Sequence, residues 1–284
     1  MAAPLTRVMV CHPDTAGWGD PARASAWREL GYGHAPDPEA AARQHSGMRE
    51  LLEASGAEVI MMKEGFGLTP DAVYVRDPSL MTDHGAICFN MGKRLRRGEG
   101  ARHRRFYEEA GIPVLGEVVS PGTAEAGDMV WLDPGRLLVG RGTRTNAQGI
   151  EQLSRLLGPR GIEVIPAPLL YGGGPDVCFH LMSILSIPGE RVALADTGLM
   201  AVETVELLQA REFTIVEIDH SERATQAANV LGLGGGRILA IRENPRTNGR
   251  LEAAGFELLT FPADEICQNG GGGPTCLTRP LLRG

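Results

Sequence analysis

Short apolar runs alternate with helix-like stretches along the whole chain, and this alternation restricts the fold more than any other feature of the sequence. Apolar and β-branched runs predict strands at residues 7–10, 58–62, 72–75, 86–89, 129–132, 136–139, 163–165, 181–187, 192–195, 214–218, 238–241 and 257–260. Amphipathic stretches predict helices at residues 38–55, 100–110, 147–157, 201–209, 221–231 and 248–254. The sequence therefore predicts an α/β fold.

Several of the predicted strands are hairpin neighbours. Residues 129–132 and 136–139, for example, are joined through Asp133, Pro134 and Gly135. A sheet of parallel strands alone contains no hairpins, because parallel neighbours need a long crossover, so we expect mixed sheets. No linker or low-complexity tract divides the chain, and we expect one domain over residues 1–284.

Composition restricts the partners and the compartment. The 284 residues carry a formal net charge of −7, which argues against nucleic acid or an anionic membrane as the main partner. No apolar run approaches the roughly 18 residues of a transmembrane helix, and the first residues do not resemble a signal peptide. The five cysteines include no Cys-x-x-Cys pair, so neither a disulfide framework nor a zinc site is predicted. We expect a cytoplasmic protein.

The C-terminal segment contains the strongest candidate nucleophile. Four consecutive glycines, residues 270–273, lie just before Cys276. Such a run is retained in a tight fold where the backbone passes close to something, and its bare amides can lower the pKa of a nearby thiol. A frayed tail is the alternative, but the apolar Leu277 and Leu281 argue against it.

Two aspartates flank the predicted strand 72–75. Asp71 precedes it, and Asp77 follows it just before Pro78. Carboxylates at a strand end suit a cationic ligand, because a planar guanidinium pairs with them through two hydrogen bonds. An ordinary Asp-Pro turn is the alternative interpretation.

A second acidic cluster is followed by an arginine at a helix start. Glu125 and Asp128 lie in a turn with small neighbours, where a carboxylate shielded from water could transfer a proton or fix a substrate cation. Arg144 precedes the predicted helix 147–157, where the helix dipole disfavours a cation, which favours a role in anion binding. A solvated surface arginine is the alternative.

A third cluster begins with the glycine-rich segment 172–174 and leads to His180. A histidine among apolar residues is more often a buried core residue, but a cysteine elsewhere that needs a base favours a catalytic role. Cys178 lies two residues earlier and would share its face of a strand. The glycines at 232–236 are not followed by a helix and do not predict a dinucleotide site.

In order along the chain, these clusters resemble the dimethylarginine dimethylaminohydrolase family of the guanidine-modifying pentein superfamily. The matching segments are Gln44-His45, residues 71–78, 97–99, 125–128 and 144–149, His180-Leu181 and Cys276. The resemblance implies a five-bladed α/β propeller built from β-β-α-β units around a central channel. It implies no metal and no organic cofactor.

The resemblance also implies three catalytic residues. Cys276 attacks the guanidinium carbon and forms a covalent thiouronium. His180 protonates the departing amine and then deprotonates the hydrolytic water. Glu125 holds and orients the guanidinium between carboxylates while the thiolate approaches its face.

The same resemblance implies the substrate-binding residues. Asp77 holds the other edge of the guanidinium, and Asp128 adds negative charge. Asp71 and Arg144 contact the amino-acid end of the substrate. A second carboxylate-binding arginine of the family aligns with Asn90.

Four departures from the family pattern bear on the substrate. Met182 stands where deiminases and amidinotransferases have an aspartate, which favours the dimethylargininase branch. The glycine run before Cys276 looks more like a deiminase, and Arg76 stands where an acidic residue is common. The basic segment 93–97 either compensates for Asn90 or is a solvated loop.

The sequence thus predicts a cysteine hydrolase of a guanidino compound, with an N-methylated arginine converted to citrulline and an alkylamine. An arginine deiminase or dihydrolase, an amidinotransferase and a non-catalytic guanidino-binding protein are the alternatives. The expected partner is a small guanidino molecule, and homodimerisation is left open.

Overall fold

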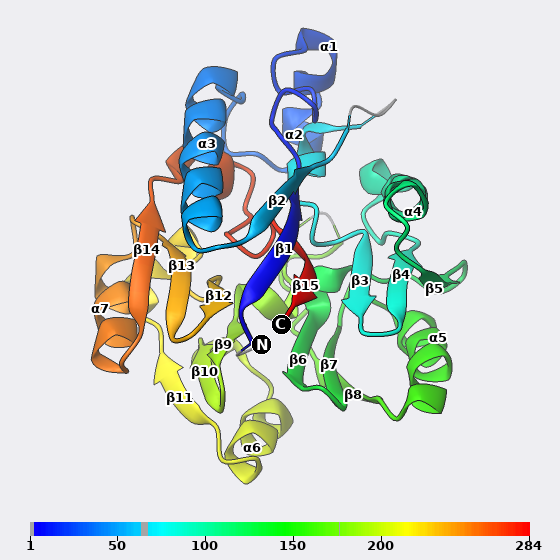
Figure 1. Cartoon of the computed structure of the whole chain (residues 1–284), viewed down its shortest axis with the longest axis vertical. Coiled ribbons are helices and arrows are strands. Elements are labelled where there is room, and N and C mark those ends of the chain that lie inside the picture. The colour runs from blue at the N-terminus through cyan, green and yellow to red at the C-terminus, as the bar shows by residue number, and fades with distance from the viewer. Residues whose placement is uncertain (1–2, 64–67, 176) are drawn as a thin grey trace.

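The computed structural model describes residues 3–63, 68–175 and 177–284. Its strands form five three-stranded sheets that surround a common centre (Figure 1). In each sheet the middle strand pairs antiparallel with one neighbour and parallel with the other. This confirms the expected mixed sheets and the propeller of β-β-α-β units.

The first sheet contains β15 (Arg279–Arg283), β1 (Leu5–Val10) and β2 (Glu58–Met61), and the second contains β3 (Ser79–Thr82), β4 (Gly85–Phe89) and β5 (Val114–Val118). The third contains β6 (Met129–Asp133), β7 (Arg136–Arg141) and β8 (Glu163–Pro168). The fourth contains β9 (Leu185–Gly189), β10 (Val192–Ala195) and β11 (Thr214–Glu217), and the fifth contains β12 (Leu231–Gly234), β13 (Arg237–Ile241) and β14 (Glu257–Phe261).

One helix connects the two parallel strands of each sheet and lies on the outside of the ring (Figure 1). These helices are α3 (Pro38–Ala54), α4 (Glu99–Glu109), α5 (Ala147–Leu157), α6 (Val202–Ala210) and α7 (Pro245–Ala253), and two short helices, α1 (Pro21–Ala24) and α2 (Trp27–Leu30), precede α3. Among the described residues, no helix is both long enough and apolar enough to cross a bilayer.

Local sequence explains where these helices begin and which face they bury. Asp37 caps α3, because its carboxylate accepts hydrogen bonds from two backbone amides of the first turn, and Pro38 follows it. In α5, Ile150, Leu153 and Leu157 recur at helical spacing and are buried. Packing of such faces against the sheets stabilises the ring.

The two ends of the described chain close the ring together. β15 pairs antiparallel with β1, so the first sheet takes one strand from the C-terminal segment (Figure 1). The Gly284 amide also donates to the Pro4 carbonyl at 3.1 Å. The segment after Cys276 is therefore a strand of the propeller and not a frayed tail.

Two predicted elements are wrong, and the predicted strand 181–187 is wrong in its first part, because Leu181–Ser183 form a 3-10 turn and β9 begins only at Leu185. Residues 221–231 are not a helix: Asp219 caps a 3-10 helix, His220–Thr225, and the chain then extends into β12. Gln226, with a left-handed φ of 62°, ends this short helix. The carboxylate of Glu222 accepts hydrogen bonds from the backbone amides of Arg246 and Thr247 at the start of α7. Residues 72–75 are not a strand, since Pro70–Val73 form a 3-10 turn.

Candidate active site

A cavity of about 280 Å³ lies where the loops before several sheets converge. Its lining includes five of the residues singled out in the sequence: Cys276, His180, Asp71, Asp77 and Arg144. Cys276 precedes β15, His180 precedes β9, and Asp77 precedes β3. The propeller therefore brings together residues that lie far apart in the chain.

The glycine run positions Cys276. Gly271 has a φ of 75°, which side-chain-bearing residues rarely adopt. A Cβ added to Gly273 would lie 2.4 Å from Cγ of Asn229. A Cβ on Gly270 or Gly272 would lie 2.0 or 2.4 Å from the side chain of Tyr74. The run is thus explained by one left-handed residue and by close approaches to Asn229 and Tyr74.

Asn229 contacts the sulfur of Cys276 and was not predicted from the sequence. Its Oδ1 accepts hydrogen bonds from the amide and hydroxyl of Thr275, at 3.0 and 2.6 Å. These two donors fix the orientation of the amide group, so that Nδ2 donates to Cys276 Sγ at 3.3 Å. The residue lies inside the stretch wrongly predicted as a helix, and no local motif marks it.

The surroundings of Cys276 disfavour its thiolate. Burial raises its pKa, and the negative charge of Asp77 raises it further. A hydrogen bond with the Gly273 backbone and the positive charge of His180 oppose this shift without reversing it. A cationic ligand bound beside the sulfur would favour the thiolate.

His180 and Glu125 form a buried ion pair. Nε2 of His180 donates to Oε2 of Glu125 at 2.8 Å. Burial lowers the pKa of His180, but the charges of Cys178 and Asp128 and the bond to Glu125 overcome it and hold the pKa well above its usual value. Burial likewise raises the pKa of Glu125. The hydrogen bond to His180 and the positive charges of His180 and Arg144 reverse this effect and hold the pKa of Glu125 well below its usual range.

The remaining ring nitrogen of His180 is the one available for chemistry. Nδ1 lies 3.6 Å from Sγ of Cys178, which also lines the cavity. A Cβ on Gly127 would lie 2.3 Å from this nitrogen, so glycine is needed for the ring to pack there. Cys178 is therefore a second thiol beside the same histidine.

Asp71 and Asp77 each keep one free carboxylate oxygen. Lys93 Nζ donates to Asp71 Oδ2 at 2.6 Å, and Arg96 pairs with Asp77. Oδ1 of both aspartates is buried and has no hydrogen-bond partner in the part of the chain that the structure describes. Each oxygen can accept a donor from a ligand in the cavity.

The basic segment 93–97 is not simply a solvated loop. Arg96 is buried between Asp77 and Glu99, and its Nη2 donates to Glu99 Oε2 at 2.8 Å. Lys93 also donates to the Leu30 carbonyl at 2.7 Å. Both cations hold the carboxylates of the cavity in place, a role that depends on contacts across the fold.

Arg144 offers donors for an anion. Its Nη1 contacts Oε2 of Glu125 at 3.2 Å. Its Nε and Nη2 are buried and have no partner among residues 3–63, 68–175 and 177–284. Within the same cavity, Arg144 can therefore bind a negatively charged group of a ligand, and the free aspartate oxygens can bind a positively charged group.

Two residues predicted to bind substrate lie outside the cavity. Asp128 accepts from the Thr145 hydroxyl at 2.6 Å and from the Leu181 amide at 3.0 Å, so it anchors the turn that follows His180. Burial raises its pKa to about 6. Asn90 donates to the Gly122 carbonyl at 2.7 Å and braces a loop instead of facing a ligand.

A metal ion fits this site less well than an organic cation. One ligand atom from each of Asp77, Glu125 and His180 lies within 4.8 Å of the other two. However, Arg96 and Arg144 already pair with the two carboxylates, and Nε2 of His180 is bonded to Glu125. A divalent ion would have to displace these cations.

Comparison with known proteins places the chain in a family. A family model described as N,N-dimethylarginine dimethylhydrolase, eukaryotic, matches residues 29–283. The N(G),N(G)-dimethylarginine dimethylaminohydrolase of Pseudomonas aeruginosa is 28% identical over 244 residues, which cover 84% of this chain and 87% of that protein.

Solved structures agree in fold. A dimethylarginine dimethylaminohydrolase adduct with S-methyl-L-thiocitrulline has a TM-score of 0.77 and 26% identity, covering 99% of this chain and 100% of that one. The N-terminal domain of a cyanobacterial arginine dihydrolase has a TM-score of 0.80 and 19% identity, covering 98% and 97%. The protein belongs to the dimethylarginine dimethylaminohydrolase family, whose members are hydrolases of C–N bonds in linear amidines.

Proposed function

We propose that the protein is a cysteine hydrolase that converts an N-methylated arginine into citrulline and an alkylamine. The observation that carries the proposal is the free Oδ1 of Asp71 and of Asp77, two residues that line the same cavity as Cys276. A guanidinium donates from its edges to carboxylates in its plane. Its face then stays open to the sulfur.

In the first step, the Cys276 thiol releases its proton to solvent once the substrate cation is bound, and the thiolate adds to the guanidinium carbon. The adduct expels the alkylamine once its nitrogen is protonated, and a thiouronium remains on Cys276. We assign the proton to Nδ1 of His180, because Nε2 is bonded to Glu125. The raised pKa of His180 keeps this acid charged before the step.

In the second step, water replaces the sulfur. Neutral His180 takes a proton from the water, and the oxygen adds to the thiouronium carbon. The C–S bond breaks, its electron pair returns to Sγ of Cys276, and the ureido product leaves. One water is consumed and one amine is released in each cycle.

Glu125 has a different role in this geometry from the one that the resemblance implied. Its Oε1 accepts from the Lys93 amide at 2.7 Å, and its Oε2 meets both His180 and Arg144. With both oxygens occupied, we assign Glu125 to orient and charge His180. Asp71, which the resemblance placed at the amino-acid end of the substrate, is assigned together with Asp77 to the guanidinium. Arg144 is assigned to the substrate carboxylate.

The testing experiment is a panel of dimethylarginine, monomethylarginine, arginine and agmatine, with organic products and released amines identified by mass spectrometry. We expect citrulline with dimethylamine or methylamine. Agmatine lacks the carboxylate that Arg144 would bind, so its kcat/KM should be about tenfold to a hundredfold lower. His180→Asn should slow turnover by roughly 10²–10⁴-fold and leave the thiouronium adduct on the protein.

Arginine deiminase or dihydrolase activity is the second candidate, favoured by the similarity in fold to the cyanobacterial arginine dihydrolase. A strong preference for arginine with ammonia release would select it over the first. Transfer of the amidino group to an added amine would indicate an amidinotransferase, and binding with neither adduct nor turnover would indicate a binding protein.

We further propose that residues 1–284 form a single catalytic domain that works in the cytoplasm, and that it assembles as a homodimer. Limited proteolysis, cell fractionation and sedimentation equilibrium test these three points in turn. Two stable proteolytic fragments, recovery in another compartment or a monomer at micromolar concentration would contradict the respective point.

A further inference from the structure

A second and larger cavity lies at the opposite ends of the strands from the active site. Its volume is about 1000 Å³, and its lining includes the hairpin turns at residues 83–85, 133–135 and 189–191. These turns follow the first strands of three sheets, whereas Asp77, Glu125 and His180 precede those strands. The two cavities therefore occupy the two ends of the propeller.

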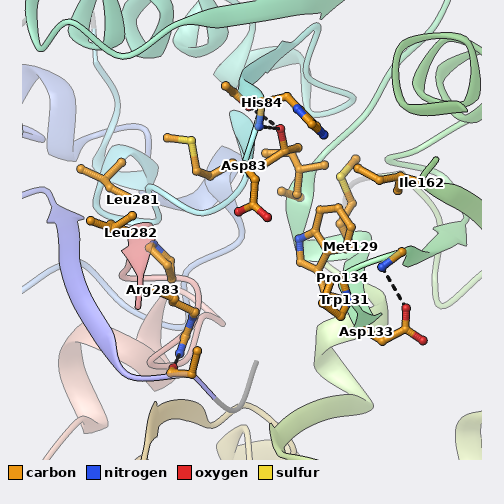
Figure 2. Close-up of a pocket in the computed structure, with 18 of the residues that line it drawn as sticks. Asp83, His84, Met129, Trp131, Asp133, Pro134, Ile162, Leu281, Leu282 and Arg283 are labelled. Carbon is orange, nitrogen blue, oxygen red and sulfur yellow. Dashed lines mark hydrogen bonds between the residues drawn. The ribbon is translucent and has the colours of Figure 1, made fainter. Parts of the chain in front are cut away.

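The walls of this cavity are largely apolar. Figure 2 shows Leu281 and Leu282 on one side, with Met129 and Trp131 facing them across the space. Ile162 lies further along the second wall. Such walls suit the hydrocarbon part of a small organic ligand.

Two buried arginines without carboxylate partners line the same cavity. Arg76 is 4% exposed, and its guanidinium forms no hydrogen bond or ion pair with the described residues; its Nε is buried and unpartnered. Arg279 is 3% exposed, donates from Nη2 to the Arg76 carbonyl, and also has an unpartnered Nε. Neither guanidinium forms an ion pair with a carboxylate of the described residues. The charge of Asp77 acts on both and opposes the fall in their pKa without reversing it.

A bound anion would neutralise the two buried guanidinium groups. Burying a guanidinium without a partner is strongly unfavourable, and two like charges close together add to the cost. Burial and the charge of Arg279 both lower the pKa of Arg76, which is the direction that such crowding produces. Arg283 adds a third cation to the lining, with hydrogen bonds to the carbonyls of Ala3 and Gly232 at 3.0 and 2.9 Å.

The acidic residues of the lining do not supply that anion. Asp83 and Glu190 are exposed at the rim, and neither forms an ion pair with Arg76 or Arg279. Asp133 is paired with Arg136 at 2.8 Å. The carboxylate that would complete the site must come from outside the described chain.

We propose that this cavity binds a small organic carboxylate with an apolar body, its carboxylate paired with Arg76 and Arg279 and its chain against Trp131 and Met129. A carboxylate accepts two parallel hydrogen bonds from a guanidinium, a match that neither an alcohol nor an ammonium can make. The site is separate from the catalytic cavity and does not depend on the proposed reaction.

Octanoate is a suitable probe, with octanol and octylammonium as neutral and cationic analogues of the same chain length. Binding is measured by titration calorimetry on the full chain. We expect octanoate to bind about tenfold or more tightly than either analogue, as one charge-assisted contact allows. Equal binding of octanol would overturn the proposal, because the arginines would then have no role.

Variants locate the site. Arg76→Gln and Arg279→Gln should each weaken octanoate binding about tenfold or more, whereas Asp83→Asn should strengthen it by removing a negative charge at the rim. Arg160→Gln, at an exposed arginine of the same lining, is the matched control and should change binding less than about threefold. Equal losses in Arg160→Gln and Arg76→Gln would mean that only rim charge attracts the anion.

Folding and location are controlled separately. Removing an unpaired buried charge should not lower Tm, so Arg76→Gln is expected to fold; if it does not, the comparison of octanoate with octanol in the unaltered protein still decides. Competition with citrulline tests the location. Displacement of octanoate by citrulline would place it in the catalytic cavity and overturn the proposal.

Discussion

At the scale of single residues, two thiols lie beside one histidine. Cys276 and Cys178 both line the catalytic cavity, but only Cys276 receives a hydrogen bond from Asn229 and follows the glycine run. The structure thus gives one of them a fixed donor and leaves the other exposed. A substitution of each decides which sulfur reacts.

We expect Cys276→Ala to abolish turnover and Cys178→Ala to leave the chemical step largely intact. The reason is that a carbon–sulfur bond must form at the nucleophile, so its loss removes the covalent route entirely. Single-turnover rates and intact mass after mixing with substrate measure both effects. Turnover near the unaltered rate in Cys276→Ala would refute this mechanism, and an adduct that depends on Cys178 would identify the rival nucleophile.

Asn229 should act on the reaction through Cys276. Asn229→Asp keeps the acceptor for Thr275, removes the Nδ2 donor and adds a negative charge beside the sulfur. The thiol pKa should therefore rise further, and kcat/KM should fall about tenfold to a hundredfold, the value of one charge-assisted hydrogen bond. Thiolate absorbance and alkylation rate against pH check the pKa.

Thr275→Ser, which retains the hydroxyl, is the control and should have a small effect. A purely structural role for Asn229 would lower stability without moving the thiol pKa. Both an unchanged pKa and an unchanged kcat/KM in Asn229→Asp would contradict the assigned role.

The His180–Glu125 pair predicts how stability depends on pH. The pKa of His180 is raised in the folded state, so its contribution is present below about 6.5 and is lost as pH rises through the folded value. The pKa of Glu125 is lowered, so its contribution is present above about 4.3 and is lost as pH falls. The pair should stabilise most between these limits.

Glu125→Gln should therefore lower the free energy of unfolding by about 3 kcal/mol near pH 5.5, the loss typical of removing one partner from a buried pair. The difference from the unaltered protein should shrink as pH rises through the folded pKa of His180. Urea titrations across the pH range measure it. Glu203→Gln, at an exposed glutamate, is the control. If the loss of unfolding free energy were independent of pH in both variants, the pairing of Glu125 with His180 would be contradicted.

Much of the site could be predicted from residue types alone, but the residues that hold the site residues in place could not. Cys276, His180, Asp71, Asp77 and Arg144 lie in short motifs and do share one cavity. Asn229 could not be found in this way. The basic segment 93–97 was noticed, but the contacts of Lys93 and Arg96 with the two aspartates were not, because they exist only once distant loops converge.

At the scale of elements, the helices with clear apolar periodicity were predicted most closely. α3 and α5 each have an N-cap side chain and buried residues at helical spacing, and both were predicted nearly to their ends. β12 was not predicted, because its sequence of alternating leucine and glycine has weak strand propensity. Its extended form depends on pairing with β13.

β15 offers a test of how the C-terminal element stabilises the fold. Leu281 is 8% exposed and packs in the largest core cluster, whereas its neighbour Leu282 is 57% exposed. Leu281→Ala should cost about 2–4 kcal/mol of unfolding free energy and Leu282→Ala less than about 0.5 kcal/mol. Chemical denaturation measures both. Equal losses would show that β15 does not pack as described.

At the scale of the whole molecule, five similar units close into a ring, and closure depends on pairing β15 with β1. The sequence predicted hairpins and helices, and the resemblance predicted five units. Which strand completes the first sheet could not be read locally, because the two partners are separated by nearly the whole chain. Closure also fixes Cys276, since β15 begins three residues after it.

A ring should tolerate a new opening where no site residue depends on the backbone. A circular permutant can be made by joining Gly284 to Ala3 with a short flexible linker and opening the chain between Gly235 and Gly236. We expect this permutant to fold and to retain turnover within about tenfold. Those two glycines lie in the β12–β13 hairpin turn and a Cβ on either would meet nothing within 4 Å. Tm and steady-state kinetics measure the outcome.

The matched control is a permutant with the same linker, opened between Gly271 and Gly272 beside Cys276. The new opening cuts the segment that holds Gly273 against Asn229. Turnover should fall by at least about a hundredfold, the cost of misplacing a reacting group by about 1 Å. The far-ultraviolet circular dichroism of this permutant should stay close to that of the first. Unfolding of the first permutant would contradict closure through β15. Full activity in the second would show that the glycine run does not position the nucleophile.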